Sequence, residues 1–386
     1  MQEVVIAGIG QTAVGEHWDI SLKELAFYAL EAARADAGGL RPEALYVANM
    51  LAPALSHQSH LGTLIADFAG LQGIEAYTVE AAGASGGAAL RAGYLAIASG
   101  AVKTALVLGV EKMSDQTVTN VNAAAATATD SDYEAEQGLT PASQAALLMR
   151  RYFHEYDVPE FALAGFPVTA HANGASNKNA MFQSPIKVES YQRAGMVSDP
   201  LNMFDVAPYA DGGAAVLLTR RDLLPENFGH PLVRISGSSV VTDTLALHDR
   251  PNPLILNAAR VSIERACSQA GIQPADADLF ELFDAYSILG ALSLEAAGLS
   301  EPGMGWEWAQ NGSLGLAGKM PVATFGGLKA RGYPGGATGV YQVLEAALQL
   351  RGQAGDNQVK DAKIALVQSL GGPASTAAAH VLTLAE

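Results

Sequence analysis

The chain has 386 residues, of which 49% are hydrophobic, so it can form a large core in two halves of similar size. Its 23 Lys and Arg residues against 39 Asp and Glu residues give a formal net charge of −16, which argues against nucleic acid or an anionic membrane as a partner. The single cysteine, Cys267, excludes a disulfide framework and a cysteine-based metal site, and fits a reducing, cytoplasmic location.

The chain begins with an apolar strand signal at residues 4–6, which we expect to end at Gly8-Ile9-Gly10. No signal peptide is visible, and no apolar run reaches membrane-spanning length. A capping box at Ser21 and Glu24 opens a helix. Further signals in this half are strands at 45–49, 76–79, 104–109 and 214–219 and helices at 61–70 and 88–98.

The second half repeats this alternation. Its signals are strands at 232–236, 278–282, 364–368 and 380–384 and helices at 254–271, 287–297 and 338–350. We therefore expect an α/β protein with halves at 1–225 and 226–386 and a mostly parallel sheet in each half. Residues from about 112 to 200 interrupt the pattern and predict an inserted loop region. Within this region, we expect no regular helix at 116–130, which lacks an amphipathic period, and a helix at 141–156. We expect His171 to Asn177 in a loop.

Residues 79–90 form the most informative stretch, because a strand, a turn of small residues and a helix follow one another. The free backbone N–H groups at such a helix start can hold a negative oxygen. On this stretch alone, a crowded turn that needs glycine for packing is the favoured explanation.

The stretch resembles the nucleophile turn of thiolases, in the branch of sterol-carrier-protein-linked and archaeal thiolases, where it reads roughly E-A-A-C-A-S-G. The resemblance extends over essentially the whole chain through four more frames, at 171–177 (H-x-N-G-x-x-N), 281–286, 326–339 and 368–372. It implies the thiolase fold, a duplicated five-layered α-β-α-β-α architecture with an inserted loop domain that covers the acyl pocket. It also implies a homodimer.

The frames are kept, but the reactive residues of the family are replaced. Gly83 stands where the acyl-accepting cysteine belongs, and Phe283 and Tyr333 stand where histidines belong. Ser369 replaces a cysteine that many members carry. Ser85 lies two residues beyond the nucleophile position, with no histidine left to activate it. We therefore expect no thiolase activity.

One interpretation is a different reaction at the same place. The N–H groups at Gly83 and in the Gly371 loop would hold a thioester oxygen, and loss of the cysteine side chain would leave room beside the thioester. The Tyr333 phenol would act on a β-hydroxyl. Either nearby N–H groups and the helix dipole lower its pKa, or the phenol relays a proton to water or Asp284. Tyr286 is the candidate for a second tyrosine.

These features resemble the thiolase-related aldolases that remove steroid or bile-acid side chains. The resemblance implies retro-aldol cleavage of a β-hydroxyacyl-CoA into a ketone or aldehyde and a shorter acyl-CoA. It also implies a small zinc-ribbon/OB-fold companion protein, and no cofactor beyond the coenzyme A of the substrate.

Two other interpretations stay open. In one, the protein is a catalytically dead scaffold subunit in which Tyr333 and Phe283 fill an emptied pocket. In the other, it is an acyltransferase of the acetyl-CoA acetyltransferase type.

The remaining candidates are residues of the pocket and its surroundings. Phe283 and Phe325 are expected to line the acyl pocket, and His171 and Ser369 to contact substrate, although His171 also suits a structural histidine. Asp284 also suits a helix cap. Lys329 and Arg331 are expected either to meet the phosphates of coenzyme A or to be solvated.

Overall fold

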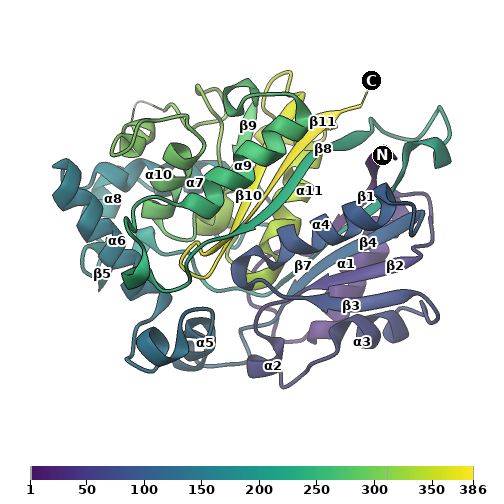
Figure 1. Cartoon of the computed structure of the whole chain (residues 1–386), viewed down its shortest axis with the longest axis horizontal. Coiled ribbons are helices and arrows are strands. Elements are labelled where there is room, and N and C mark those ends of the chain that lie inside the picture. Colours follow the sequence, from purple (N-terminus) through teal and green to yellow (C-terminus); the bar gives the residue numbers. More distant parts are fainter. Residues whose placement is uncertain (1, 311, 386) are drawn as a thin grey trace.

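The computed structural model of the chain describes residues 2–310 and 312–385. One nine-stranded sheet runs through the molecule (Figure 1). Its strands, in spatial order, are β3 (Glu75–Val79), β2 (Ala44–Ala48), β4 (Thr104–Glu111), β7 (Gly212–Arg220), β1 (Val4–Gln11), β8 (Val233–Thr242), β11 (Thr376–Leu384), β10 (Ile364–Gly371) and β9 (Leu279–Glu281).

The sheet is mixed, so the prediction of a mostly parallel sheet in each half is wrong. β2 pairs parallel with β3 and with β4, and β9 pairs parallel with β10. The other neighbours pair antiparallel. The insert between β4 and β7 and the short turn between β10 and β11 both return the chain antiparallel. The alternation of strands and helices in the sequence does not reveal these two returns.

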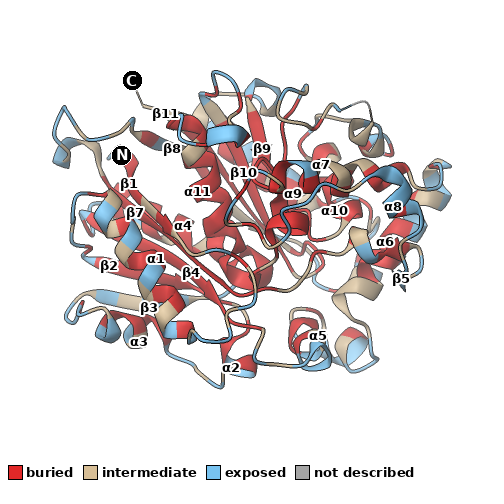
Figure 2. Ribbon diagram, turned by 180° about the vertical axis from the view of Figure 1, so that it is seen from behind, coloured by how far each residue is buried: buried red, intermediate tan, exposed pale blue. Residues whose placement is uncertain are grey.

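Helices cover both faces of the sheet and also lie between its two halves. α1 (Leu22–Asp36) and α3 (Leu61–Phe68) pack on the outer face of the N-terminal strands, and α9 (Asn257–Ala270) and α10 (Ser287–Ala296) on that of the C-terminal strands. α4 (Ser85–Ala98) and α11 (Thr338–Leu350) share one core with strands of both halves. α11 is buried along nearly its whole length (Figure 2). The five-layered architecture expected from the sequence is thus confirmed.

β1 continues through Gly8 and Gly10 to Gln11, so the predicted strand end at these glycines is wrong. A Cβ at Gly8 would overlap the carbonyl oxygen of Ala33, and one at Gly10 would overlap that of Ala29. The glycines therefore let α1 pack directly on the strand, and they do not break it.

The segment between β4 and β7 is more helical than its sequence suggested. It contains α5 (Val118–Ala126), α6 (Pro141–Tyr156), α7 (Gly165–Gly174), α8 (Val188–Gln192) and the hairpin of β5 (Met196–Ser198) and β6 (Leu201–Asn202); α2 (Ala52–Leu55) precedes β3.

The helix predicted at 141–156 is confirmed, but two other expectations for this segment are wrong. Residues 118–126 form a helix, since alanines favour one and the Thr117 side chain caps its first turn. His171 lies in α7 and not in a loop. Within the described residues, no helix is both long and apolar enough to cross a bilayer.

Candidate active site

The turn before α4 buries Gly83. Ala82 has a φ of 50°, and a short 3-10 helix, Ala82–Ala84, leads directly into α4. The Ser85 hydroxyl donates to the Ala82 carbonyl at 2.6 Å and accepts from the Ala81 N–H at 2.8 Å. Ser85 is therefore engaged inside the turn, in agreement with its exclusion as a nucleophile.

Aromatic side chains occupy the space in front of Gly83. A Cβ placed on Gly83 would lie 2.9 Å from Phe283 Cζ, 2.9 Å from Tyr333 Oη and 2.5 Å from the Leu370 carbonyl oxygen. The Phe283 and Tyr333 rings meet edge to face, with centroids 5.7 Å apart. The expectation that loss of the cysteine leaves room beside the thioester is therefore wrong, because these rings fill that room.

This crowding makes Gly83→Cys a destabilising change. We expect it to lower the free energy of unfolding by about 1–3 kcal/mol, the usual cost of overpacking a core, as measured by urea denaturation. We also expect no thiolysis of acetoacetyl-CoA, because Phe283 and Tyr333 supply no imidazole base. Gly195→Cys is the control for an added cysteine, since a Cβ at that exposed position meets no atom within 4 Å and its φ is not positive. Recovered thiolysis in Gly83→Cys would contradict this description of the site.

A narrow pocket of about 40 Å³ opens beside Gly83, and three tyrosines line it. Tyr333 and Tyr286 were predicted from the sequence; Tyr209 was not. The other lining residues are Met50, Gly83, Ala125, Ala128, Thr129, Pro141, Gln144, Phe283, Ala285, Leu289, Leu370 and Gly372. We call this site the tyrosine pocket.

Backbone hydrogen bonds hold Tyr209 and Tyr333 side by side. The Tyr333 N–H donates to the Pro208 carbonyl at 2.9 Å, and the Ala210 N–H donates to the Tyr333 carbonyl at 3.2 Å. Their rings stack with centroids 5.9 Å apart. The one sequence signal for Tyr209 was its place just before the chain re-enters the sheet at Asp211-Gly212-Gly213.

The tyrosines of the pocket are neutral at physiological pH. Burial raises the pKa of Tyr333 and of Tyr286 well above that of a free phenol, and raises the pKa of Tyr209 to about 12. The prediction that N–H groups and a helix dipole lower the pKa of Tyr333 is therefore wrong, because loss of solvent dominates. Neutral phenols can donate a hydrogen bond to a developing oxyanion and pass a proton on.

Asp284 lies behind the pocket. Its Oδ1 accepts from the Leu328 N–H at 2.7 Å, so it anchors the loop that leads to Tyr333. Burial raises the pKa of this carboxyl group, and the charge of Lys329 opposes the shift. Asp284 does not line the tyrosine pocket, so the structure gives the predicted proton relay from Tyr333 no direct path to it.

Lys329 and Arg331 are buried, with 2% and 1% of their surface exposed, so the expectation that they are solvated is wrong, and a contact with the phosphates of coenzyme A stays a prediction. Lys329 Nζ donates to the Asp205 carbonyl at 2.7 Å, and Arg331 Nη1 donates to Glu345 Oε2 at 2.6 Å. Both cations therefore hold the loop against the core.

Three more predicted site residues lie outside the pocket lining. Phe325 is buried elsewhere, and its carbonyl accepts from Asn177 Nδ2 at 2.9 Å. Ser369 is buried against Gly87 and Gly339. Gly371 pairs with Thr376 at the end of β10, while its two neighbours in the chain reach the pocket.

His171 belongs to a separate apolar groove of about 480 Å³, lined by Phe182, Val197, Met203, Phe204, Val206, Ala207, Pro208 and Lys329. His171 stacks on Phe182 with ring centroids 5.8 Å apart, and burial lowers its pKa. Residues 206–208 line this groove and the next residue, Tyr209, lines the tyrosine pocket. The two hollows therefore lie on either side of one segment.

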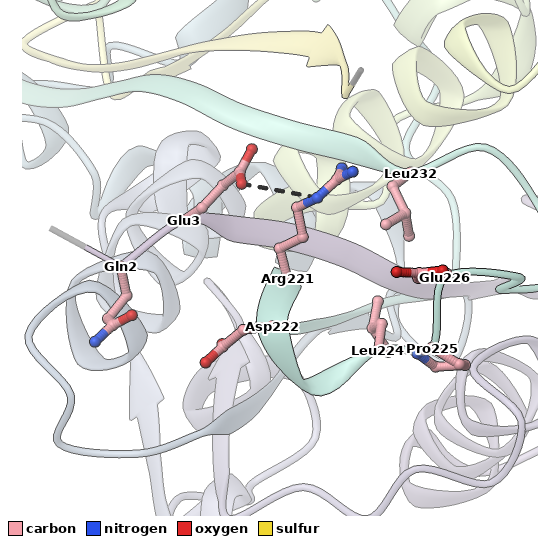
Figure 3. A pocket seen from close by; sticks show the side chains of 8 residues that line it. All are labelled: Gln2, Glu3, Arg221, Asp222, Leu224, Pro225, Glu226 and Leu232. Carbon is pink, nitrogen blue, oxygen red and sulfur yellow. Dashed lines mark ion pairs between the residues drawn. The ribbon is translucent and has the colours of Figure 1, made fainter.

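A further hollow of about 520 Å³ lies where the N-terminus meets the segment after β7 (Figure 3). Arg221 pairs with Glu3 there at 4.0 Å, and Asp222 pairs with Arg220. None of the predicted site residues lines it. Across 2–310 and 312–385, no group of three or more His, Cys, Asp or Glu side chains is arranged to hold a metal ion.

Comparisons with known proteins agree with this architecture. A family model described as "Thiolase, N-terminal domain" matches residues 4–222, and one described as "Thiolase C-terminal domain-like" matches 239–384. An acetyl-CoA acetyltransferase of Methanothermobacter thermautotrophicus is 41% identical over 99% of this chain and 100% of its own length. Sterol carrier protein 2 of Rattus norvegicus is 31% identical over 55% of this chain and 40% of its own length.

Among solved structures, one described as "Ltp2-ChsH2(DUF35) aldolase" superimposes with a TM-score of 0.85. The match covers 99% of this chain and 98% of the other, at 23% identity. At this level of identity the likeness establishes a shared fold.

Proposed function

The chain belongs to the thiolase family, and on this basis we propose that it is an acyl-CoA carbon–carbon lyase. The proposed reaction is retro-aldol cleavage of a β-hydroxyacyl-CoA into a ketone or aldehyde and a shorter acyl-CoA. One observation carries the proposal. Phenol and phenyl groups occupy the space in front of Gly83, where an acyl-carrying side chain would have to stand.

The proposed chemistry needs no ionised side chain. In one concerted step, the Tyr333 oxygen accepts the proton of the β-hydroxyl while the Tyr333 hydroxyl gives its own proton to the α-carbon. The carbon–carbon bond breaks and the phenol stays neutral. Backbone N–H groups at the Gly83 turn stabilise the negative charge that develops on the thioester oxygen in this step. Tyr209, whose ring stacks on that of Tyr333, and Tyr286 line the same pocket. Atoms and charge balance without a cofactor other than the coenzyme A of the substrate.

The names of similar proteins suggest two different activities. The structural neighbour is called an aldolase, which agrees with the proposal, whereas the 41% identical relative is called an acetyl-CoA acetyltransferase. Acetyl transfer through an acyl-enzyme requires a nucleophile that Gly83 lacks. Peptide mass mapping after incubation with acetyl-CoA should therefore show no covalent adduct on residues 79–90.

Direct assay tests the proposed reaction. Purified protein, alone and with a companion protein, receives a β-hydroxyacyl-CoA with a tertiary β-carbon, and ketone formation is followed by mass spectrometry. Ketone together with the shortened acyl-CoA is the expected result. Turnover of acetoacetyl-CoA with free coenzyme A, and none of the hydroxyacyl-CoA, would favour the acyltransferase instead.

We also propose that the apolar groove at His171 receives the pantetheine arm of the thioester, since it adjoins the tyrosine pocket through residues 206–209. A small zinc-ribbon/OB-fold companion is part of the proposal. The name of the structural neighbour joins two components, Ltp2 and ChsH2, and this supports a companion for the present chain.

The cytoplasmic location stays a prediction.

A homodimer would cover the open edge of the sheet at β3. Among the strands of the described residues, β3 has β2 as its one neighbour, and Tyr77 on β3 is 45% exposed. An uncovered edge strand is a liability in a soluble fold. We expect the mass of a dimer in light scattering at micromolar concentration, and expect Thr78→Pro on this edge to shift the protein toward monomer. A monomeric wild type would disprove the dimer.

A further inference from the structure

One polar side chain of the tyrosine pocket lacks a partner. Gln144, on α6, is 3% exposed, and its Nε2 makes no hydrogen bond with any residue that the structure describes. Its backbone N–H donates to the Thr140 carbonyl at 3.0 Å inside the helix, so only the side-chain amide is free. A buried amide without a partner is costly, and such groups usually meet a ligand or water.

The rest of the pocket limits what that partner can be. The volume of about 40 Å³ holds only a few heavy atoms, and none of the lining residues carries a charge. A carboxylate would lose its hydration there without gaining a cation. A short group with an uncharged hydrogen-bond acceptor, such as a hydroxyl or carbonyl, fits both the size and the chemistry.

We infer that Gln144 is a specificity-determining residue, and that the substrate is a β-hydroxyacyl-CoA whose β-carbon bears only small groups. One of them carries an uncharged acceptor that the Gln144 amide binds. This inference rests on the proposed function, and it replaces the bulky, steroid-type acyl group expected from the sequence. Leu289, which is 4% exposed on α10 and also lines the pocket, limits the length of the branch.

Binding of uncleavable analogues tests the inference without requiring turnover. Two acyl-CoAs that lack the β-hydroxyl are compared by titration calorimetry, one with a β-hydroxymethyl and one with a β-ethyl branch of the same size. We expect wild type to bind the hydroxymethyl compound about tenfold more tightly, as one hydrogen bond to a buried donor provides. A carboxymethyl branch should bind more weakly than either.

Gln144→Met keeps the volume and removes the amide. It should abolish the preference while leaving the affinity for the ethyl compound within about twofold. Gln144→Asn, which draws the amide back, serves if the methionine variant does not fold. The exposed Gln137 provides the matched control, Gln137→Met, which should keep the wild-type preference.

Three results would each overturn the inference. Wild type binds both analogues with equal affinity, or Gln144→Met keeps the preference for the hydroxymethyl compound, or neither analogue binds. Cleavage of the corresponding β-hydroxy compounds is measured in parallel. If cleavage is absent while the binding preference is present, the proposed reaction fails and the assignment of Gln144 stands. If cleavage occurs without any preference, the assignment fails and the reaction stands.

Discussion

Tyr333→Phe is expected to lower the rate of cleavage by roughly 10²–10⁴-fold, the usual worth of general acid–base catalysis. The variant keeps the ring that packs on Phe283 and Tyr209 and removes only the oxygen that carries the proton. Thermal stability should therefore change little. Single-turnover kinetics with saturating protein in excess over the substrate measure the chemical step directly.

Two controls distinguish an acid–base role of Tyr333 from a role in which its ring only fills space in the pocket. Tyr133→Phe changes a phenol that is 69% exposed and should leave the rate unchanged. The pH profile of wild type provides the other control. Because burial raises the pKa of Tyr333 above its usual value, the group stays protonated well beyond neutrality. We expect a nearly flat rate from about pH 6 to 9, without the inflection of an imidazole near 6.5. Full activity in Tyr333→Phe would remove the phenol from the mechanism.

Arg331→Met is expected to destabilise the fold by about 3–5 kcal/mol, because it leaves Glu345 as an uncompensated buried charge. Arg331 and Glu345 are 1% and 2% exposed and form an ion pair at 2.6 Å. The pair fixes the loop two residues before Tyr333. Chemical denaturation at pH 7 measures the loss.

The double variant Arg331→Met with Glu345→Leu tests this explanation, because removing both charges should restore most of the lost stability. Arg260→Met breaks an exposed pair with Glu264 and should cost less than about 1 kcal/mol. If the single Arg331 variant is as stable as the Arg260 variant, the buried pair does not hold the loop.

The sequence predicted the fold and the turn at Gly83 because both depend on local signals and on motif frames. Continuous apolar strands and capped helices are encoded within a few residues, and Gly83 and Tyr333 were located by the frames around them. The direction of strand pairing was not predictable in this way. It depends on where a connection returns, which the alternation of strands and helices does not specify.

The missed features depend on burial and on contacts distant in the sequence. Tyr209 reaches the pocket only because its backbone pairs with Tyr333. The loss of solvent that raises the phenol pKa values, and the burial of Lys329 and Arg331, follow from packing that no local pattern reports. The space vacated at Gly83 was predicted to be empty, because the positions of the rings of Phe283 and Tyr333 were not available from the sequence.

The most direct test of a tyrosine-based lyase uses a β-hydroxyacyl-CoA labelled with ¹³C at the β-carbon, given to the protein together with its companion. We predict that the label appears by NMR as a free ketone or aldehyde carbon, at equal amounts with the shortened acyl-CoA, and that Tyr333→Phe loses this signal. A label that stays in the intact thioester with wild type would contradict the account and leave the protein as a scaffold subunit.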